Sequence, residues 1–151
     1  METLIVFDST HGNTEKIAKA IYDAITGEVK VIRASIANPA ELEAIDLLIV
    51  GSPTNGGRPT PATQKFLEGL AESSIKGKKV AAFDTRFSKR WVKVFGFAAD
   101  RISEDLKAKG GVIVSSPEGF FVKGTKGPLK EGEIERAAEW AKEIMRIISV
   151  Q

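Results

Sequence analysis

The sequence LIVFDSTHGNTEKIAKAI, residues 4–21, joins an uninterrupted apolar run to a helix-like pattern through a short polar cluster. The run begins at Thr3 and predicts a strand that is buried on both faces, because its side chains do not alternate with polar ones. Residues 14–25 place apolar side chains at helical spacing, and Gly27 provides a stop. The turn between strand and helix, residues 8–14, holds more small polar side chains than a turn requires. This surplus indicates a binding loop.

Apolar runs and amphipathic stretches continue to alternate along the rest of the chain. This alternation predicts a parallel sheet that is covered by helices on both faces. We therefore expect a single domain, residues 1–151, of the α/β class, with three layers and a doubly wound, five-stranded parallel sheet. The expected strands are 3–7, 28–34, 46–52, 79–85 and a last strand that Pro117 breaks into 111–116 and 119–124. The expected helices are 14–25, 62–71, 92–109 and 131–149.

Composition narrows the classes of function. The chain has 151 residues, of which 42% are hydrophobic and 28% are charged, which is ordinary for a soluble globular protein. The absence of cysteine excludes disulfides, thiolate catalysis and a cysteine-based zinc site, and a single histidine, His11, excludes a histidine-rich metal site. No window approaches about 18 uninterrupted apolar residues, and no signal-peptide pattern is present. We therefore expect a cytoplasmic protein that does not span a membrane.

The net charge of +2 conceals an uneven distribution of charge. Residues 1–75 carry 6 basic and 10 acidic side chains, whereas residues 76–151 carry 16 basic and 10 acidic ones. The segment 76–93 holds seven Lys or Arg side chains against Asp84 alone. Two interpretations fit this run, a solvated face and a docking surface for an acidic partner or a phosphate-bearing ligand. No nucleic-acid recognition motif accompanies it, so nucleic-acid binding is not expected.

The first loop has the features of a phosphate site. It lies beyond the carboxyl end of a strand, where open α/β sheets bind ligands, and it leads into a helix N-terminus with unpaired N–H groups. It contains no lysine or arginine and neither a P-loop nor a GxGxxG motif, so it suits a phosphate monoester held by neutral donors. In the alternative interpretation, Ser9 or Asn13 only caps the helix. The residues that supply donors or allow close backbone approach are Ser9, Thr10, Gly12, Asn13 and Thr14.

The motif Ser9-Thr10-His11-Gly12-Asn13-Thr14, placed between a strand and a helix, resembles the (S/T)-x-T-G-N-T signature of the flavodoxin family. The order of elements over essentially the whole chain is similar to that of a short-chain flavodoxin. The resemblance implies an FMN cofactor, with its phosphate held by Ser9, Thr10, His11, Gly12, Asn13 and Thr14. It also implies that two further loops border the flavin ring, with Pro53, Thr54, Asn55, Gly56 and Gly57 on one side and Asp84, Thr85, Arg86 and Phe87 on the other. Trp91 or Phe87 would cover one ring face.

The chain departs from the family pattern in three respects. His11 stands where the family usually has threonine, and the loop 53–61 lacks the aromatic residue that many flavodoxins stack on the ring. The sequence pI of about 8.8 contrasts with the strongly acidic surface of typical flavodoxins. The role of an acidic shuttle on a basic reductase therefore does not carry over, and the expected partner is an acidic redox protein that docks near 76–93.

By resemblance, the function is electron transfer, in which the flavin supplies the redox chemistry and the protein supplies placement and electrostatics. A flip of the Asn55–Gly56 peptide would favour one-electron steps. Arg86 would stabilise the negative charge of the reduced ring, unless it pairs with Asp84. The alternatives are an FMN-dependent NAD(P)H or quinone-type oxidoreductase that uses Arg86, Lys89 and Arg90, and a flavin-free binding domain of the same fold. No catalytic nucleophile or general base is expected in the protein.

Overall fold

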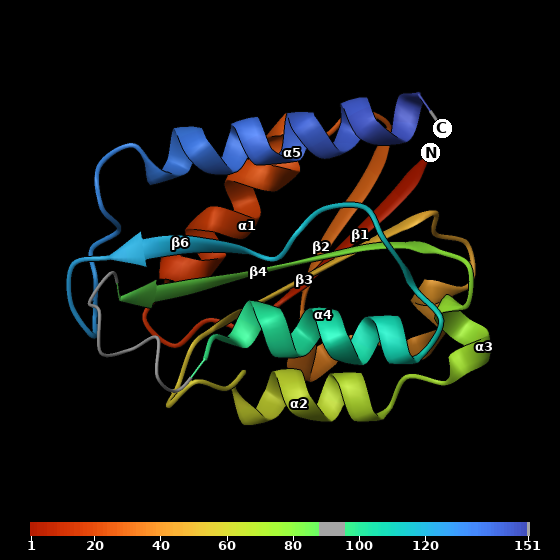
Figure 1. Cartoon of the computed structure of the whole chain (residues 1–151), viewed down its shortest axis with the longest axis horizontal. Helices are drawn as coiled ribbons and strands as arrows, with labels where there is room; N and C mark the ends of the chain where they lie inside the picture. The colour runs from red at the N-terminus through yellow and green to blue at the C-terminus, as the bar shows by residue number, and fades with distance from the viewer. Residues whose placement is uncertain (88–95, 151) are drawn as a thin grey trace.

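A computed structural model describes residues 1–87 and 96–150 and has one sheet with helices on both of its faces (Figure 1). Among these residues, no helix is both long enough and apolar enough to cross a membrane. The elements in chain order are β1 (Glu2–Phe7), α1 (Asn13–Ala24), β2 (Glu28–Arg33), the 3₁₀ helices Ala34–Ile36 and Pro39–Leu42, β3 (Leu47–Pro53), α2 (Pro61–Glu68), α3 (Glu72–Ile75), β4 (Lys79–Phe87), α4 (Ala98–Ala108), β5 (Val112–Ile113), β6 (Glu118–Val122) and α5 (Glu133–Ser149).

The sheet is parallel, and its strands lie in the order β2-β1-β3-β4-β5, with β6 also paired to β4. The short β5 pairs with the start of β4, and β6 pairs with its end, so the two share the fifth strand position. The gap between them, residues 114–117, contains the proline that was expected to break this strand. The predicted doubly wound, five-stranded parallel sheet is therefore confirmed.

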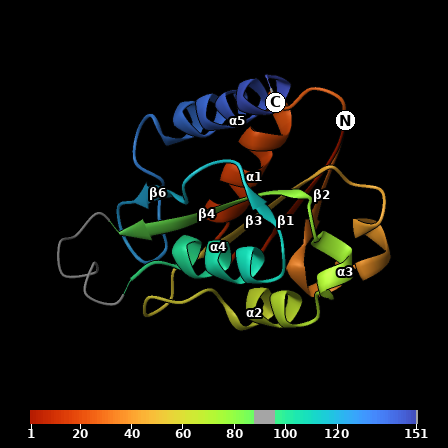
Figure 2. The same ribbon diagram turned by 45° about the vertical axis from the view of Figure 1, so that its right-hand side comes forward.

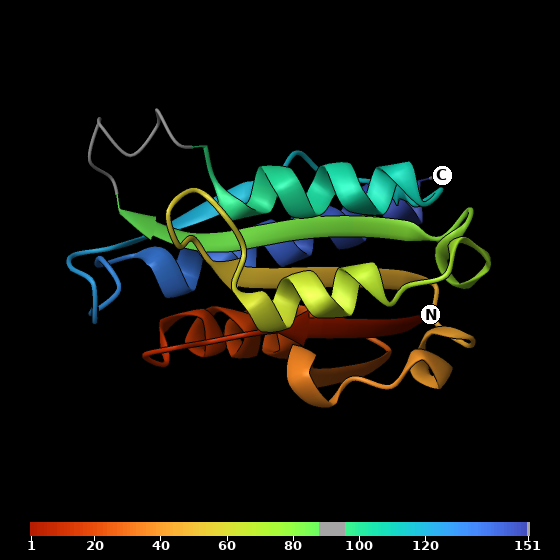
Figure 3. The same ribbon diagram turned by 90° about the horizontal axis from the view of Figure 1, so that it is seen from below.

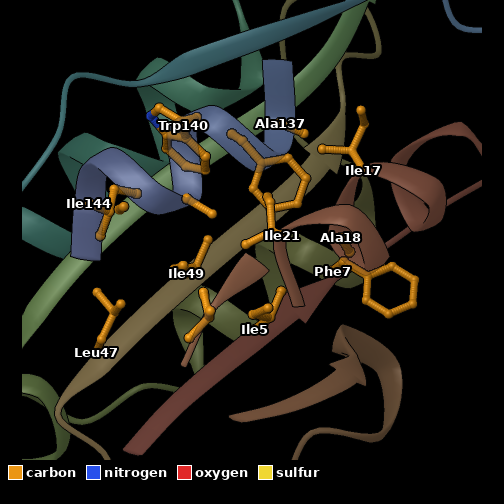
Figure 4. Close-up of a cluster of buried hydrophobic side chains, with 14 of the residues drawn as sticks. Ile5, Phe7, Ile17, Ala18, Ile21, Leu47, Ile49, Ala137, Trp140 and Ile144 are labelled. Carbon is orange, nitrogen blue, oxygen red and sulfur yellow. The ribbon is translucent and has the colours of Figure 1, made fainter. Parts of the chain in front are cut away.

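The two cores follow from the alternation of side chains along each buried strand. In β1, Ile5 and Phe7 pack toward α1 and α5, whereas Leu4 and Val6 pack toward α2 and α4. Figure 4 shows the first of these cores, in which α1 and α5 cover the sheet. Such continuous burial on both faces produces the uninterrupted apolar runs of the sequence.

The structure differs from the expected elements at the start of α4, in the strand expected at 111–116, of which only Val112–Ile113 forms β5, and in short helices that were not expected, among them the 3₁₀ helices Ala34–Ile36 and Pro39–Leu42. The expected helix 92–109 has residues 92–95 outside the described part, and the structure begins α4 at Ala98, after Gly96 with a φ of 79°. The N-terminal amides of α4 are capped from distant loops, since Ala98 N donates to Thr54 Oγ1 at 3.0 Å and Ala99 N donates to Asp84 Oδ2 at 2.9 Å. The short α3, at the end of the sheet opposite the tip of β4, was not expected either (Figure 2).

An ionic network fixes the start of α5 to β6. Glu133 is 7% exposed, and its Oε2 accepts a hydrogen bond from Phe121 N at 2.7 Å. Arg136 donates to both carboxylate oxygens of Glu133, at 3.0 and 2.7 Å, and reaches Glu118 at 2.5 Å. The Arg136 guanidinium also lies 4.5 Å from the centre of the Phe120 ring. Burial alone would raise the pKa of Glu133, but these hydrogen bonds outweigh it and lower the pKa below its ordinary value of 4.5.

This network predicts a specific acid sensitivity. A carboxyl group whose pKa is lower in the folded state contributes stability above its unfolded pKa, and that contribution is lost as the pH falls through the folded pKa. We expect Glu133→Gln to cost about 1–3 kcal/mol at neutral pH and to flatten the dependence of Tm on pH below about pH 4.5. Thermal unfolding from pH 2 to pH 7 measures this slope, and equal slopes in wild type and variant would contradict the assignment. Glu143→Gln is the matched control, because its Arg146 partner lies on the exposed face of the same helix.

Candidate functional site

The loops after β1 and β3 and the tip of β4 lie at the same end of the sheet (Figure 3). In the loop after β1, Gly12 has a φ of 90°, in the left-handed region that favours glycine, and α1 begins at the next residue. Ser9 Oγ accepts hydrogen bonds from Gly12 N at 3.1 Å and from Glu15 N at 3.3 Å. Ser9 therefore caps the helix, whereas Asn13 is its first residue. The remaining first-turn N–H groups have no acceptor within the helix and face the loop.

The loop after β3 forms a tight turn. Asn55 and Arg58 exchange backbone hydrogen bonds of 2.8 and 3.0 Å, and the two glycines between them have φ values of 56° and 81°. Positive φ at both central positions defines a type I′ turn, which glycine adopts without strain. Arg101 on α4 donates from its Nε to the Gly57 carbonyl at 2.8 Å. This bond restrains the second half of the turn, while Gly56 has open space around it.

The end of β4 contains an ion pair in place of the expected free cation. Arg86 donates to both oxygens of Asp84, at 2.7 Å from Nε and 2.8 Å from Nη2. The guanidinium lies 3.5 Å from the centre of the Phe97 ring, and it covers Gly119 of β6 on another side. The expectation that Arg86 stabilises a negative ring charge is therefore corrected, because Asp84 already neutralises it.

Asp84 lies behind the site and does not line it. The residue is fully buried, and burial raises the pKa of its carboxyl above the ordinary value of 3.8, against the opposing effects of Arg86 and of the Ala99 N–H. The predicted contact of Asp84 with the flavin ring has no geometric support, because the carboxylate points toward Arg86 and the start of α4. Its position instead links the third loop to that helix.

Hydroxyl groups connect the three loops. Thr14 Oγ1 and Thr85 Oγ1 lie 2.8 Å apart, and Thr54 N donates to the Thr85 carbonyl at 3.0 Å. Behind them, Thr60 Oγ1 donates to Asp8 Oδ2 at 2.5 Å. Because these bonds cross from one strand end to the next, the loops are held in place before any ligand arrives.

A cavity of about 100 Å³ opens where these loops meet. Most of the predicted site residues line it, including His11, which is exposed on its rim. Gly12, Gly56, Gly57 and Asp84 belong to the same loops but do not line the cavity, and Trp91 lies outside the described residues. The lining residues are Ser9, Thr10, His11, Asn13, Thr14, Pro53, Thr54, Asn55, Thr85, Arg86, Phe87, Val122 and Thr125.

Val122 and Thr125 were not anticipated from the sequence. They come from the end of β6 and the connection that follows it, so they lie at the same sheet edge as the three predicted loops. Ligand sites of open α/β sheets lie beyond the carboxyl ends of the strands, and this rule applies to β6 as well. It could have identified both residues from the sequence.

A larger cavity, of about 410 Å³, lies elsewhere and has a different character. It opens at the amino ends of β1 and β2 and is lined by Glu2, Lys30, Glu41 and apolar neighbours such as Leu4 and Ile45. Thr3 alone among its lining residues carries a hydroxyl, and no α-helix begins at this cavity. The smaller cavity therefore has the chemistry of a ligand site, and the larger one does not.

Comparison with known sequences decides the family, since the flavodoxin family model matches residues 5–140. The chain belongs to the flavodoxin family. It is similar to flavodoxin 1 of Escherichia coli, with 27% identity over 94% of this chain and 92% of that protein, and to the flavodoxin of Maridesulfovibrio salexigens, with 30% identity over 75% and 81%. The solved structure of flavodoxin 2 from Bacillus cereus superimposes with a TM-score of 0.80 at 28% identity, covering 97% and 99% of the two chains. Membership implies a flavin cofactor and electron transfer to redox partner proteins.

The basic segment of this flavodoxin does not form a single patch in its described part, residues 76–87. Lys79 begins β4 and Phe87 ends it beside the cavity, so the two lie eight residues apart, or about 26 Å at the rise of an extended strand. Lys78 Nζ donates to the backbone carbonyls of Leu42 and Glu43 and is thereby engaged within the fold. Lys76, Lys78 and Lys79 therefore lie at the opposite end of the sheet from the cavity, and residues 88–93 lie outside the described part.

Proposed function

We propose that this flavodoxin binds FMN at the carboxyl edge of its sheet and carries electrons between protein partners. Bound FMN supplies the redox chemistry, since it can accept and release electrons one at a time. The observation that carries the proposal is the combination of a helix N-terminus, a left-handed glycine and a ring of hydroxyl and amide side chains around one cavity. This site fits a phosphate monoester, because the helix N-terminus and the hydroxyl and amide side chains can donate to an anion without adding a fixed positive charge.

The proposal gives the residues of the first loop a binding role. Thr10 and Asn13 line the cavity beside the start of α1 and would donate to the phosphate together with the free first-turn N–H groups. Gly12 would permit the close approach of the backbone. A cavity of about 100 Å³ would hold a phosphate group and its immediate neighbours, and the flavin ring would extend between the second and third loops. The exposed His11 would contribute from the rim.

The second and third loops would position the ring. Thr54 and Asn55 would border the ring from the second loop and Thr85 from the third, and the hydrogen bonds of Thr85 to Thr54 N and Thr14 Oγ1 hold these loops together. Gly56 leaves space for a flip of the Asn55–Gly56 peptide, but the flip would break the hydrogen bond of 3.0 Å from Arg58 N to the Asn55 carbonyl, while Arg101 holds the Gly57 carbonyl. We expect this peptide to adjust when the redox state changes, at the cost of that bond.

A carrier is better supported than an oxidoreductase that binds its own NAD(P)H or quinone. The oxidoreductase alternative required Arg86, Lys89 and Arg90 to receive a phosphate or an acidic substrate. Arg86 is engaged with Asp84, and the other two residues lie outside the described part of the chain. We place the docking of the partner over the cavity itself, because the described lysines of the basic segment lie at the far end of the sheet.

Titration with flavins tests the proposal. Purified protein should quench the fluorescence of added FMN and bind it at least about tenfold more tightly than riboflavin, since only FMN offers a phosphate to the charge-assisted donors. Reduction by slow addition of dithionite should proceed in two spectroscopically separate steps. A single two-electron step would favour the oxidoreductase alternative, and no binding of either flavin would favour a flavin-free domain of the same fold.

A further inference from the structure

The connection from β6 to α5 forms one wall of the cavity, in addition to the walls formed by the loops after β1 and β3 and the end of β4. We call residues 123–127 the β6 loop. Val122, immediately before it, and Thr125, within it, both line the cavity. The connection lies at the same end of the sheet as the loops after β1 and β3 (Figure 3). The site is therefore enclosed by four segments of the chain.

The β6 loop has a defined conformation. Val122 and Leu129 form an antiparallel bridge at its base, and Lys123 N donates to the Pro128 carbonyl at 2.9 Å. Within the loop, Gly127 N donates to the Gly124 carbonyl at 3.0 Å. These bonds close the loop into a hairpin, so the position of Thr125 is set by backbone geometry.

The β6 loop also packs directly on the first loop. Gly127 has a φ of 100°, and a Cβ built there would lie 2.7 Å from Asn13 Oδ1 and 2.8 Å from Asn13 Nδ2. Only a residue without a side chain allows this approach. Because Asn13 opens α1, the contact places the β6 loop beside the helix N-terminus and thus at the phosphate end of the site.

We propose that Thr125 is a ligand-binding residue whose hydroxyl donates a hydrogen bond to the phosphate of the bound flavin. The inference rests on the proposed function. In the first loop, Ser9 Oγ accepts two backbone hydrogen bonds and Thr14 Oγ1 lies 2.8 Å from Thr85 Oγ1, so these contacts fix the positions of both hydroxyls. Thr125 is exposed and lines the cavity from the β6 loop, where its hydroxyl adds a donor from a segment outside the first loop.

Two variants of Thr125 separate the hydroxyl from the volume of the side chain. Thr125→Val keeps the shape and removes the donor, whereas Thr125→Ser keeps the donor. We expect Thr125→Val to weaken FMN binding by about tenfold, as the loss of a hydrogen bond to a charged group predicts, and to leave riboflavin binding unchanged. Thr125→Ser should bind both flavins within about twofold of wild type. Fluorescence titration gives the dissociation constants, and equal unfolding midpoints verify that the variants are folded.

The outcomes distinguish this inference from the proposed function. If wild type binds FMN and Thr125→Val binds it equally well, the role of Thr125 is wrong while the site stands. If the valine variant weakens FMN and riboflavin equally, its contact is not with the phosphate and the inference also fails. If wild type binds neither flavin, the proposed function fails, and the inference fails with it.

Discussion

Replacement of Arg86 by methionine is expected to destabilise the protein by about 3–5 kcal/mol, the cost of leaving a buried charge without its partner. Asp84 is fully buried and receives two hydrogen bonds from Arg86, at 2.7 and 2.8 Å. Methionine retains much of the apolar contact with Phe97 but donates nothing to the carboxylate. The Ala99 N–H, at 2.9 Å, and the Thr54 hydroxyl then remain as donors, and neither carries a charge. Urea unfolding at neutral pH measures the loss.

The same variant should acquire a distinctive pH dependence. Without Arg86, the pKa of Asp84 rises further above 3.8, because burial is then less opposed. A carboxyl group with a raised folded pKa binds its proton more tightly when folded, so stability decreases as the pH rises from 3.8 through the folded pKa. The stability of Arg86→Met should therefore fall with increasing pH in this window relative to wild type.

A double variant distinguishes the effect of the buried charge from a simple loss of packing around Arg86. In Asp84→Asn with Arg86→Met, the neutral amide can still accept from Ala99 N, and no charge is buried. We expect the double variant to recover at least half of the lost stability and to lose the added pH dependence. A cost below about 1 kcal/mol for Arg86→Met, or a double variant less stable than the single one, would contradict the buried-charge explanation.

The Asp84–Arg86 pair also indicates how far the sequence predicts the site. Residues i and i+2 of a strand point to the same face, so their pairing was one of two outcomes that the sequence left open. The choice between them depends on Gly119 and Phe97, which enclose the guanidinium from other parts of the chain. Sequence spacing does not reveal these tertiary contacts, so the sequence could not decide between a free Arg86 and the pairing with Asp84 that the structure has.

The fold was more predictable than the site because its signals are local. Continuous apolar runs identified β1 and β3, and the spacing of apolar residues identified α1 and α5. The start of α4 was misplaced because its caps, Thr54 and Asp84, are distant in sequence. The position of the β6 loop beside the first loop was missed for a similar reason, since the approach of Gly127 to Asn13 is a tertiary contact. Local patterns thus predicted the elements, while their ends and the walls of the site depend on the assembled sheet.

Replacement of Phe83 by alanine is expected to cost about 3–5 kcal/mol, the usual effect of removing a fully buried aromatic ring. Phe83 is fully buried, and its ring centre lies 6.2 Å from that of Phe120 and 6.0 Å from that of Trp140, both in edge-to-face geometry. It also covers its cross-strand neighbour Gly51, where a Cβ would lie 2.0 Å from the ring. The alanine variant therefore leaves a cavity over a strand position that has no side chain of its own.

This packing predicts that the effect of Gly51→Ala changes sign with the residue at position 83. In wild type, Gly51→Ala forces the Phe83 ring out of its rotamer and should destabilise by about 1–3 kcal/mol. In the Phe83→Ala background the space is free, so the same methyl group fills part of the cavity and should be neutral or stabilising. Denaturant unfolding of the four proteins in this double-mutant cycle gives the coupling energy. An equal cost of Gly51→Ala in both backgrounds would mean that strand geometry, and not the aromatic ring, requires glycine at this position.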